Sequence, residues 1–100
     1  MAFSSLDEVV EYLKKNKKKF NEMYGVTSMG LFGSFVSGDQ TLNSDIDMVV
    51  EMEKGKKNIH TFLQLKRLLE KEISRKVDLG FEQSLKPVIR DKIKNQIIYV

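Results

Sequence analysis

The sequence of 100 residues contains no cysteine and no apolar run long enough to cross a membrane. Without cysteine the chain can form neither disulfides nor thiolate metal sites. A membrane-spanning helix needs about 20 consecutive apolar residues, and the N-terminus lacks the basic start and apolar run of a signal peptide. We therefore expect a cytoplasmic protein that makes no membrane contact.

The composition is that of one soluble domain. Apolar residues make up 41% of the chain and charged residues 31%, which is typical of globular proteins. A chain of 100 residues can build a single core of modest stability. With no internal repeat or low-complexity segment, residues 1–100 are expected to form one domain.

Basic residues are absent from one long segment and concentrated in the next. Residues 33–53 contain five acids and no Lys or Arg, whereas residues 54–76 contain eight Lys or Arg and two Glu. An acidic pocket attracts metal ions, and a basic surround attracts phosphate or an acidic partner. The simpler interpretation of Lys54, Lys56 and Lys57 is a solvated loop. Because the run lacks the aromatic residues on which bases stack, direct nucleic-acid binding is not expected.

The hydrophobic periodicity predicts the order helix, strand, strand, helix, strand, helix. This order indicates an α/β or α+β domain in which a small mixed sheet is flanked by helices. Helices are expected between residues 6 and 24, over residues 59–73 and from residue 87, and strands over residues 26–32, 45–51 and 76–81. The apolar segment 97–100 is expected to pair at a sheet edge or to pack against a partner.

Two carboxylates lie close together on the second predicted strand. Because strand side chains alternate between faces, Asp45 and Asp47 project from the same face. Like charges held so close repel each other. Mg²⁺ relieves such repulsion because it prefers oxygen ligands, commonly one or two carboxylates together with substrate phosphates. The alternative is a solvent-facing acidic pair on an edge strand.

Gly33 and Ser34 follow the first predicted strand directly. Glycine lets the backbone turn sharply and approach a ligand closely, and Ser34 can open a short helix over residues 35–37 whose amides and hydroxyl suit a phosphate. A Walker loop is excluded, because that motif needs Lys and then Ser or Thr after Gly38, where this chain has Asp39 and Gln40.

A third acid, Asp78, lies inside the short apolar strand predicted over residues 76–81. Aspartate is disfavoured within strands, and such locally inconsistent choices are typical of functional sites. A surface acid near a turn is the alternative.

Together these motifs resemble the nucleotidyltransferase superfamily related to DNA polymerase beta, and the small size points to its minimal nucleotidyltransferase branch. The resemblance covers residues 26–100 and is carried by Gly33-Ser34, Gly38, Ser44-Asp45-Ile46-Asp47 and Asp78. It implies the nucleotidyltransferase fold. It also implies that Asp45, Asp47 and Asp78 are the catalytic residues and that together they bind two Mg²⁺ ions. The nucleotide-binding residues it implies are Gly33, Ser34 and Ser44.

The resemblance further implies a reaction and a partner. The reaction is the transfer of AMP from ATP to a hydroxyl, namely a tyrosine of a HEPN-domain toxin, so that the chain acts as the antitoxin. One departure is Phe35, since family members often have Arg directly after Gly-Ser. The alternatives are an antitoxin that neutralises its partner by binding alone, and a nucleotidyltransferase acting on a small molecule or an RNA end. The oligomeric state stays open.

Overall fold

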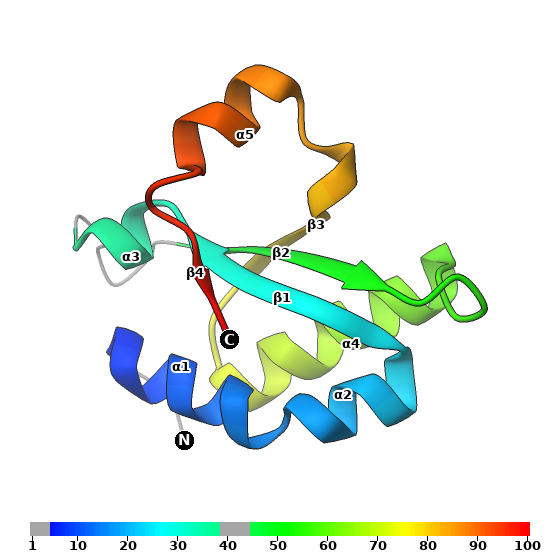
Figure 1. Cartoon of the computed structure of the whole chain (residues 1–100). Helices are drawn as coiled ribbons and strands as arrows, with labels where there is room; N and C mark the ends of the chain where they lie inside the picture. Colours follow the sequence, from blue (N-terminus) through cyan, green and yellow to red (C-terminus); the bar gives the residue numbers. More distant parts are fainter. Residues whose placement is uncertain (1–4, 39–44) are drawn as a thin grey trace.

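The computed structural model describes residues 5–38 and 45–100 and shows a four-stranded mixed sheet with helices on both faces. Helices α1, α2 and α4 lie against one face, and α5 crosses the other (Figure 1). This arrangement confirms the predicted α+β class. In chain order the elements are α1 (Leu6–Lys15), α2 (Lys17–Tyr24), β1 (Val26–Phe32), α3 (Ser34–Ser37), β2 (Ile46–Met52), α4 (Ile59–Ile73), β3 (Val77–Phe81), the 3₁₀ turn η1 (Glu82–Ser84), α5 (Pro87–Ile93) and β4 (Ile98–Tyr99).

The N-terminal helix is divided in two, although the sequence periodicity predicts one continuous helix. The break falls at Asn16, whose side-chain amide donates to the Tyr12 carbonyl at 2.8 Å. Asparagine favours such local side-chain bonds to the backbone over uninterrupted helix. The second half, α2, ends as predicted at Gly25, which has φ +71 in the left-handed region that glycine adopts without strain.

The strand order is β3-β2-β1-β4. Strand β1 pairs antiparallel with both β2 and β4, whereas β2 pairs parallel with β3 through the crossover helix α4. The apolar segment near residue 100 therefore takes the first of its two predicted places, because Tyr99 pairs with Gly30 at the edge of the sheet.

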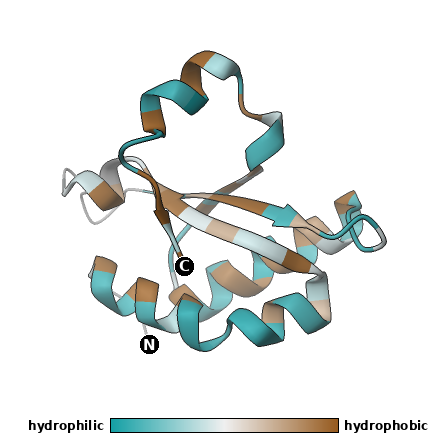
Figure 2. Cartoon of the chain, in the orientation of Figure 1, coloured by the Kyte–Doolittle hydropathy of each residue, from teal (hydrophilic) through white to brown (hydrophobic). Residues whose placement is uncertain are grey.

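The hydrophobic core lies between the sheet and the layer formed by α1, α2 and α4. Figure 2 shows the apolar stripes of these helices turned towards the strands. Alternate strand residues complete the core, among them Met29, Leu31, Met48, Val50 and Val77. Among the described residues no polar or charged side chain is buried. None of the helices in the described part of the chain is long and apolar enough to cross a membrane.

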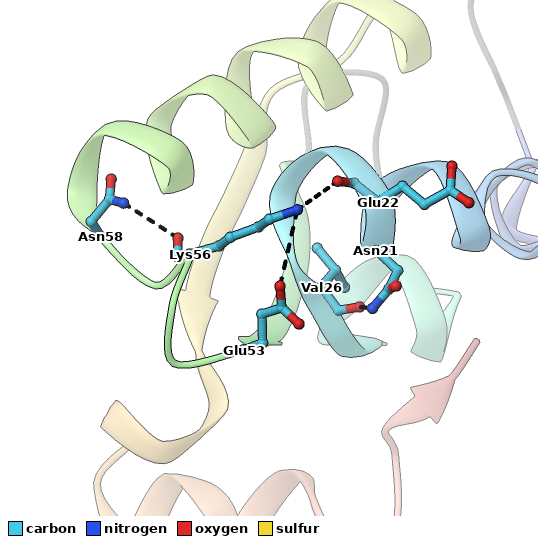
Figure 3. Close-up of polar contacts among 6 residues, drawn as sticks. All are labelled: Asn21, Glu22, Val26, Glu53, Lys56 and Asn58. Atoms are coloured by element: carbon cyan, nitrogen blue, oxygen red, sulfur yellow. Dashed lines mark hydrogen bonds and ion pairs between the residues drawn. The ribbon is translucent and has the colours of Figure 1, made fainter.

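The loop after β2 packs on the turn between α2 and β1 (Figure 3). The Lys56 ammonium group donates to the Glu22 carbonyl at 2.7 Å and lies 4.0 Å from the Glu53 carboxylate. The Asn21 amide donates to the Val26 carbonyl at 2.9 Å. These contacts join the end of β2 to the start of β1, so at least one lysine of this basic loop has a structural partner.

The sheet face opposite the core is covered by the segment that begins at η1. Val49 is only 1% exposed although it does not belong to the core cluster, so it is buried from this second side. Glu51 fixes the start of the covering segment, because its carboxylate accepts from the Gln83 N–H at 2.8 Å and from the Lys57 ammonium group at 3.1 Å.

Candidate active site

Two of the predicted site acids are brought side by side by the parallel pairing of β2 and β3. Asp47 and Asp78 are direct partners in the strand register. The residues that flank Asp47, Ile46 and Met48, are buried in the core, so the carboxylate projects from the opposite face of the sheet. Asp47 is partly buried, and Asp78 is exposed. The structure thus places both acids on the sheet face opposite the core, near the start of β2 and of β3.

The electrostatics of the site are dominated by crowded negative charge. Burial raises the pKa of the Asp47 carboxyl above its usual range, and the nearby charges of Asp78 and Asp45, with a hydrogen bond to Asp78, raise it further. Each of these causes disfavours the ionised form. A cation between the carboxylates reverses this balance by favouring ionisation.

The turn after β1 touches Asp47. Gly33 has φ +79, and a Cβ atom built on it would lie 2.2 Å from Oδ2 of Asp47. Only a residue without a side chain fits there. The Gly33 carbonyl then accepts from the N–H groups of Val36 and Ser37, which starts the short helix α3. The sequence predicts this turn and helix, and the structure adds their contact with the acid.

Two of the predicted nucleotide-binding residues lie wholly or partly outside the described structure. Ser34 is the first residue of α3, but its side chain lies outside the described part of the structure. Ser44 lies outside the described residues altogether. Asp45, directly after it, is exposed and lies one residue before β2.

A divalent cation needs several oxygen ligands. Within residues 5–38 and 45–100 no group of three or more His, Cys, Asp or Glu side chains converges closely enough to hold a metal ion. Asp47 and Asp78 do face each other, and Mg²⁺ is commonly held by one or two carboxylates with substrate phosphates supplying further oxygens. The predicted triad of Asp45, Asp47 and Asp78 is thus not assembled as a metal site in this structure. Asp47 and Asp78 would hold a magnesium ion only together with oxygens from a nucleotide.

Sequence reasoning missed a basic group at this edge of the sheet. Phe35 is only 1% exposed because it is part of the core, and the Arg75 guanidinium carbon lies 5.1 Å from the centre of its ring, within cation–π distance. Arg75 precedes β3, and the carbonyl of the next residue, Lys76, accepts from the Ile46 N–H at 2.9 Å. Arg75 thus lies in the turn between α4 and β3, against the core residue Phe35. The excess of basic residues over 54–76 was the available signal.

A mixed sheet with paired acids on β2 and β3 and with Gly33 against one of them is an arrangement that suits a nucleotidyltransferase. Residues 13–100 match the nucleotidyltransferase domain family, so the chain belongs to that family.

The relatives of the chain indicate which kind of nucleotidyltransferase it resembles. It is 34% identical over 100 residues to the protein adenylyltransferase MntA of Thermococcus cleftensis, and the match covers 100% of both chains. It is 39% identical to a Methanocaldococcus jannaschii protein named as a candidate protein adenylyltransferase, covering 96% of this chain and 98% of the relative. The chain is a nucleotidyltransferase homologous to the MntA-type enzymes.

Solved structures support the fold. A structure described as a candidate minimal nucleotidyltransferase superposes with a TM-score of 0.80 at 23% identity and 98% coverage of both chains. A toxin–antitoxin crystal structure with AMP-PNP gives a TM-score of 0.66 at 24% identity, covering 93% of this chain and 69% of that one. A Shewanella oneidensis complex of a tri-AMPylated HEPN toxin with its MNT antitoxin gives 0.57 at 19% identity, covering 93% and 66%.

Proposed function

We propose that the chain transfers AMP from ATP to a tyrosine hydroxyl of a HEPN-domain toxin and thereby acts as its antitoxin. The observation that carries the proposal is the pairing of Asp47 with Asp78 beside Gly33. This arrangement places carboxylates and a close-approach turn within one site, as nucleotidyl transfer requires. Support for the acceptor comes from the relatives, which include protein adenylyltransferases and neighbours solved as toxin–antitoxin complexes.

The residues divide into three roles. Asp45 and Asp47 would hold two magnesium ions, and Asp78 would hold one of them and assist deprotonation of the acceptor hydroxyl. Gly33, Ser34 and Ser44 bind the phosphates of ATP. When bound, the ions supply activation of the attacking oxygen and stabilisation of the departing pyrophosphate.

Arg75 adds positive charge to this scheme. The acidic segment 33–53 contains no Lys or Arg, so charge balance at a triphosphate depends on groups from other elements. We propose Arg75, whose guanidinium carbon lies 5.1 Å from the centre of the Phe35 ring, as one of these groups.

The test is a mass-shift assay with the purified chain, ATP, Mg²⁺ and a HEPN-domain toxin encoded beside it. We expect the toxin to gain AMP units on tyrosine, and the Asp45→Ala/Asp47→Ala variant to give no gain. A stable complex without any gain in mass would replace the proposal with an antitoxin that acts by binding alone. Transfer only to a small molecule or an RNA 3′ end, each supplied in a parallel reaction, would replace it with the third interpretation.

A further inference from the structure

Helix α5 lies over the sheet face opposite the core, and its polarity is reversed (Figure 1). A surface helix usually turns apolar residues inward and charged residues outward. In α5, Val88 is 77% exposed and Ile89 is 41% exposed, whereas Arg90, Asp91 and Lys94 line a pocket beneath the helix. None of the α5 residues is buried, although α1, α2 and α4 each bury at least two. The arrangement of α5 therefore suits contact with a second molecule better than packing on the core.

The pocket beneath α5 has a volume of about 430 Å³, and ligand-binding clefts commonly measure roughly 300–1,000 Å³. Its walls include the apolar side chains of Leu85, Ile93 and Ile97. Arg90 and Lys94 add positive charge, and because they are four residues apart they lie on the same side of the helix. The pocket therefore suits an apolar group that has a negative charge beside it.

The basic residues of α5 and its two flanks have no ion-pair partner within the described structure. Residues 86–94 contain four Lys or Arg and one Asp, and none of these cations belongs to an ion pair of 4.0 Å or less in the described part of the chain. Of the two acids that line the pocket, Glu82 already accepts a hydrogen bond from the Tyr99 hydroxyl, so only Asp91 offsets the cations there. Four lysines elsewhere each lie within 4.0 Å of a glutamate: Lys18, Lys19, Lys56 and Lys57. Charge complementarity at α5 thus favours an acidic partner.

The pocket lies over the sheet face that carries the site acids. Gly30 lies between Met29 and Leu31, which belong to the core, so a side chain at position 30 would point to the opposite face. A Cβ atom built there would lie 2.9 Å from Cδ1 of Ile97 and 3.3 Å from Cδ1 of Tyr99. Both residues line the pocket, which is therefore bounded by side chains packed on this face.

The strand register places the pocket beside the acids without including them. Gly30 pairs with Val49, and Asp47 lies two residues before Val49 on the same face. Two residues along a strand span about 7 Å. Of the described residues, neither the acids nor Gly33 lines the pocket. Its occupant is therefore a group next to the reacting phosphates and distinct from them.

We propose that α5 and the pocket beneath it form the docking surface for the acceptor protein, through a segment that carries carboxylates next to apolar side chains. The inference rests on the proposed function, because the partner is the toxin that the chain is proposed to adenylylate. The carboxylates of the segment pair with Arg90 and Lys94, and an apolar side chain enters the pocket. Val88 and Ile89, on the outer side of α5, need the larger surface of a protein to cover them. A segment held here brings a neighbouring toxin residue to the acids.

Titration calorimetry of the chain with the intact HEPN-domain toxin tests the charged part of this surface. Arg90→Glu/Lys94→Glu should weaken binding about tenfold or more, because repulsion replaces attraction. The matched control is Arg67→Glu/Lys71→Glu, which changes the same residue types at the same spacing on α4, where both are exposed. Since α4 lies on the other side of the sheet, the control should bind the toxin as the unchanged chain does.

A second pair of variants tests the apolar part. Val88→Ser/Ile89→Ser should weaken toxin binding about tenfold, as the loss of central apolar contacts in an interface does. Its control is Ile59→Ser/Leu63→Ser on α4, because Ile59 is 68% exposed and Leu63 is 39% exposed. The control should keep the affinity of the unchanged chain. Circular dichroism checks that all four variants are folded, as expected for side chains that are not buried.

Three results would overturn the docking surface. One is an unchanged toxin affinity in both α5 variants, or no toxin binding by the unchanged chain. Another is a loss of affinity for Mg²⁺ with AMP-PNP, instead of for the toxin, in Arg90→Glu/Lys94→Glu, since the pocket would then bind the nucleotide. The third is a change in self-association alone, measured by sedimentation, because the occupant would then be a second copy of the chain.

The mass-shift assay separates this inference from the proposed function. If the toxin gains AMP and both α5 variants bind it with unchanged affinity, the docking surface is wrong and the proposed function stands. If the α5 variants bind the toxin more weakly but the unchanged chain transfers no AMP to it, the docking surface stands and the transfer is wrong.

Discussion

The contact between Gly33 and Asp47 restricts which residues can occupy these two positions. Gly33 must have a positive φ and no side chain, because Oδ2 of Asp47 occupies the place of a Cβ atom. Asp47 in turn carries a partly buried carboxylate whose pKa is raised by burial and by the charges of Asp78 and Asp45. The Gly-Ser and Asp-x-Asp motifs predict both residues, but no sequence pattern shows that they touch.

Asp47→Asn should stabilise the chain in the absence of ligands and abolish transfer. The raised pKa of Asp47 means that ionised Asp47 lowers stability once the pH rises through the folded-state pKa. We expect a gain of a few degrees in melting temperature at pH 7 that shrinks as the pH falls towards the ordinary carboxyl pKa. Calorimetry over this range tests it, with the exposed Glu11→Gln as the control. A lower melting temperature at pH 7 would contradict the crowding of charge.

Gly33→Ala and Gly38→Ala form a matched pair. Both glycines have a positive φ, +79 and +89, but a Cβ atom on Gly38 meets nothing within 4 Å. Gly38→Ala should cost only backbone strain, about 1 kcal/mol. Gly33→Ala should cost roughly 1–2 kcal/mol more and should lose transfer activity, since Asp47 must move. Urea unfolding and the mass-shift assay measure the two effects, and equal losses in both variants would show that the contact is unimportant.

The elements show where sequence patterns are sufficient and where they are not. The strands at 26–32 and 77–81 and the helix capped by Asn58 follow from local periodicity and capping. The register of Asp47 with Asp78 depends on how α4 returns the chain to the sheet, and the burial of Phe35 depends on its neighbours in the core. Both are through-space relations, so sequence reasoning recognised the acids but treated Phe35 only as a lost basic residue.

Glu70 links α4 to the strand that carries Asp78. Its carboxylate accepts from the Val77 N–H at 3.0 Å in a partly buried position. Glu70→Ala should therefore lower the free energy of unfolding by about 1–3 kcal/mol, the range for a lost hydrogen bond to a charged group. Chemical denaturation measures this, with Gln64→Ala on the exposed face of the same helix as the control. If both variants lose the same stability, the Glu70 bond does not anchor β3.

In the whole molecule, the hydrophobic core and the site acids lie on opposite faces of one sheet. The core and the helices α1, α2 and α4 occupy one face, whereas α5 lies over the other (Figure 1). Asp47 projects from this second face, because its neighbours Ile46 and Met48 are buried in the core. Substitutions at the acids should therefore leave the core intact, which makes them informative variants.

Ligand binding should stabilise the folded chain and should require the acids. Mg²⁺ with AMP-PNP at about 100 times its dissociation constant should add about 2.7 kcal/mol to the free energy of unfolding, which raises the melting temperature by roughly 10–20 °C in a domain of this size. The Asp45→Asn/Asp47→Asn variant should show no such rise. Differential scanning fluorimetry tests this, and an equal shift in the variant would place the nucleotide elsewhere.

The closeness of Gly33 to Asp47 also links two binding equilibria. Gly33 lies against the Asp47 carboxylate, because a Cβ atom built on Gly33 would lie 2.2 Å from Oδ2 of Asp47. If the turn holds a phosphate and the acid a cation, as proposed, we expect the two affinities to be coupled, and each ligand then changes the affinity for the other by the same factor. Cooperativity of this kind would need no second subunit and no moving domain.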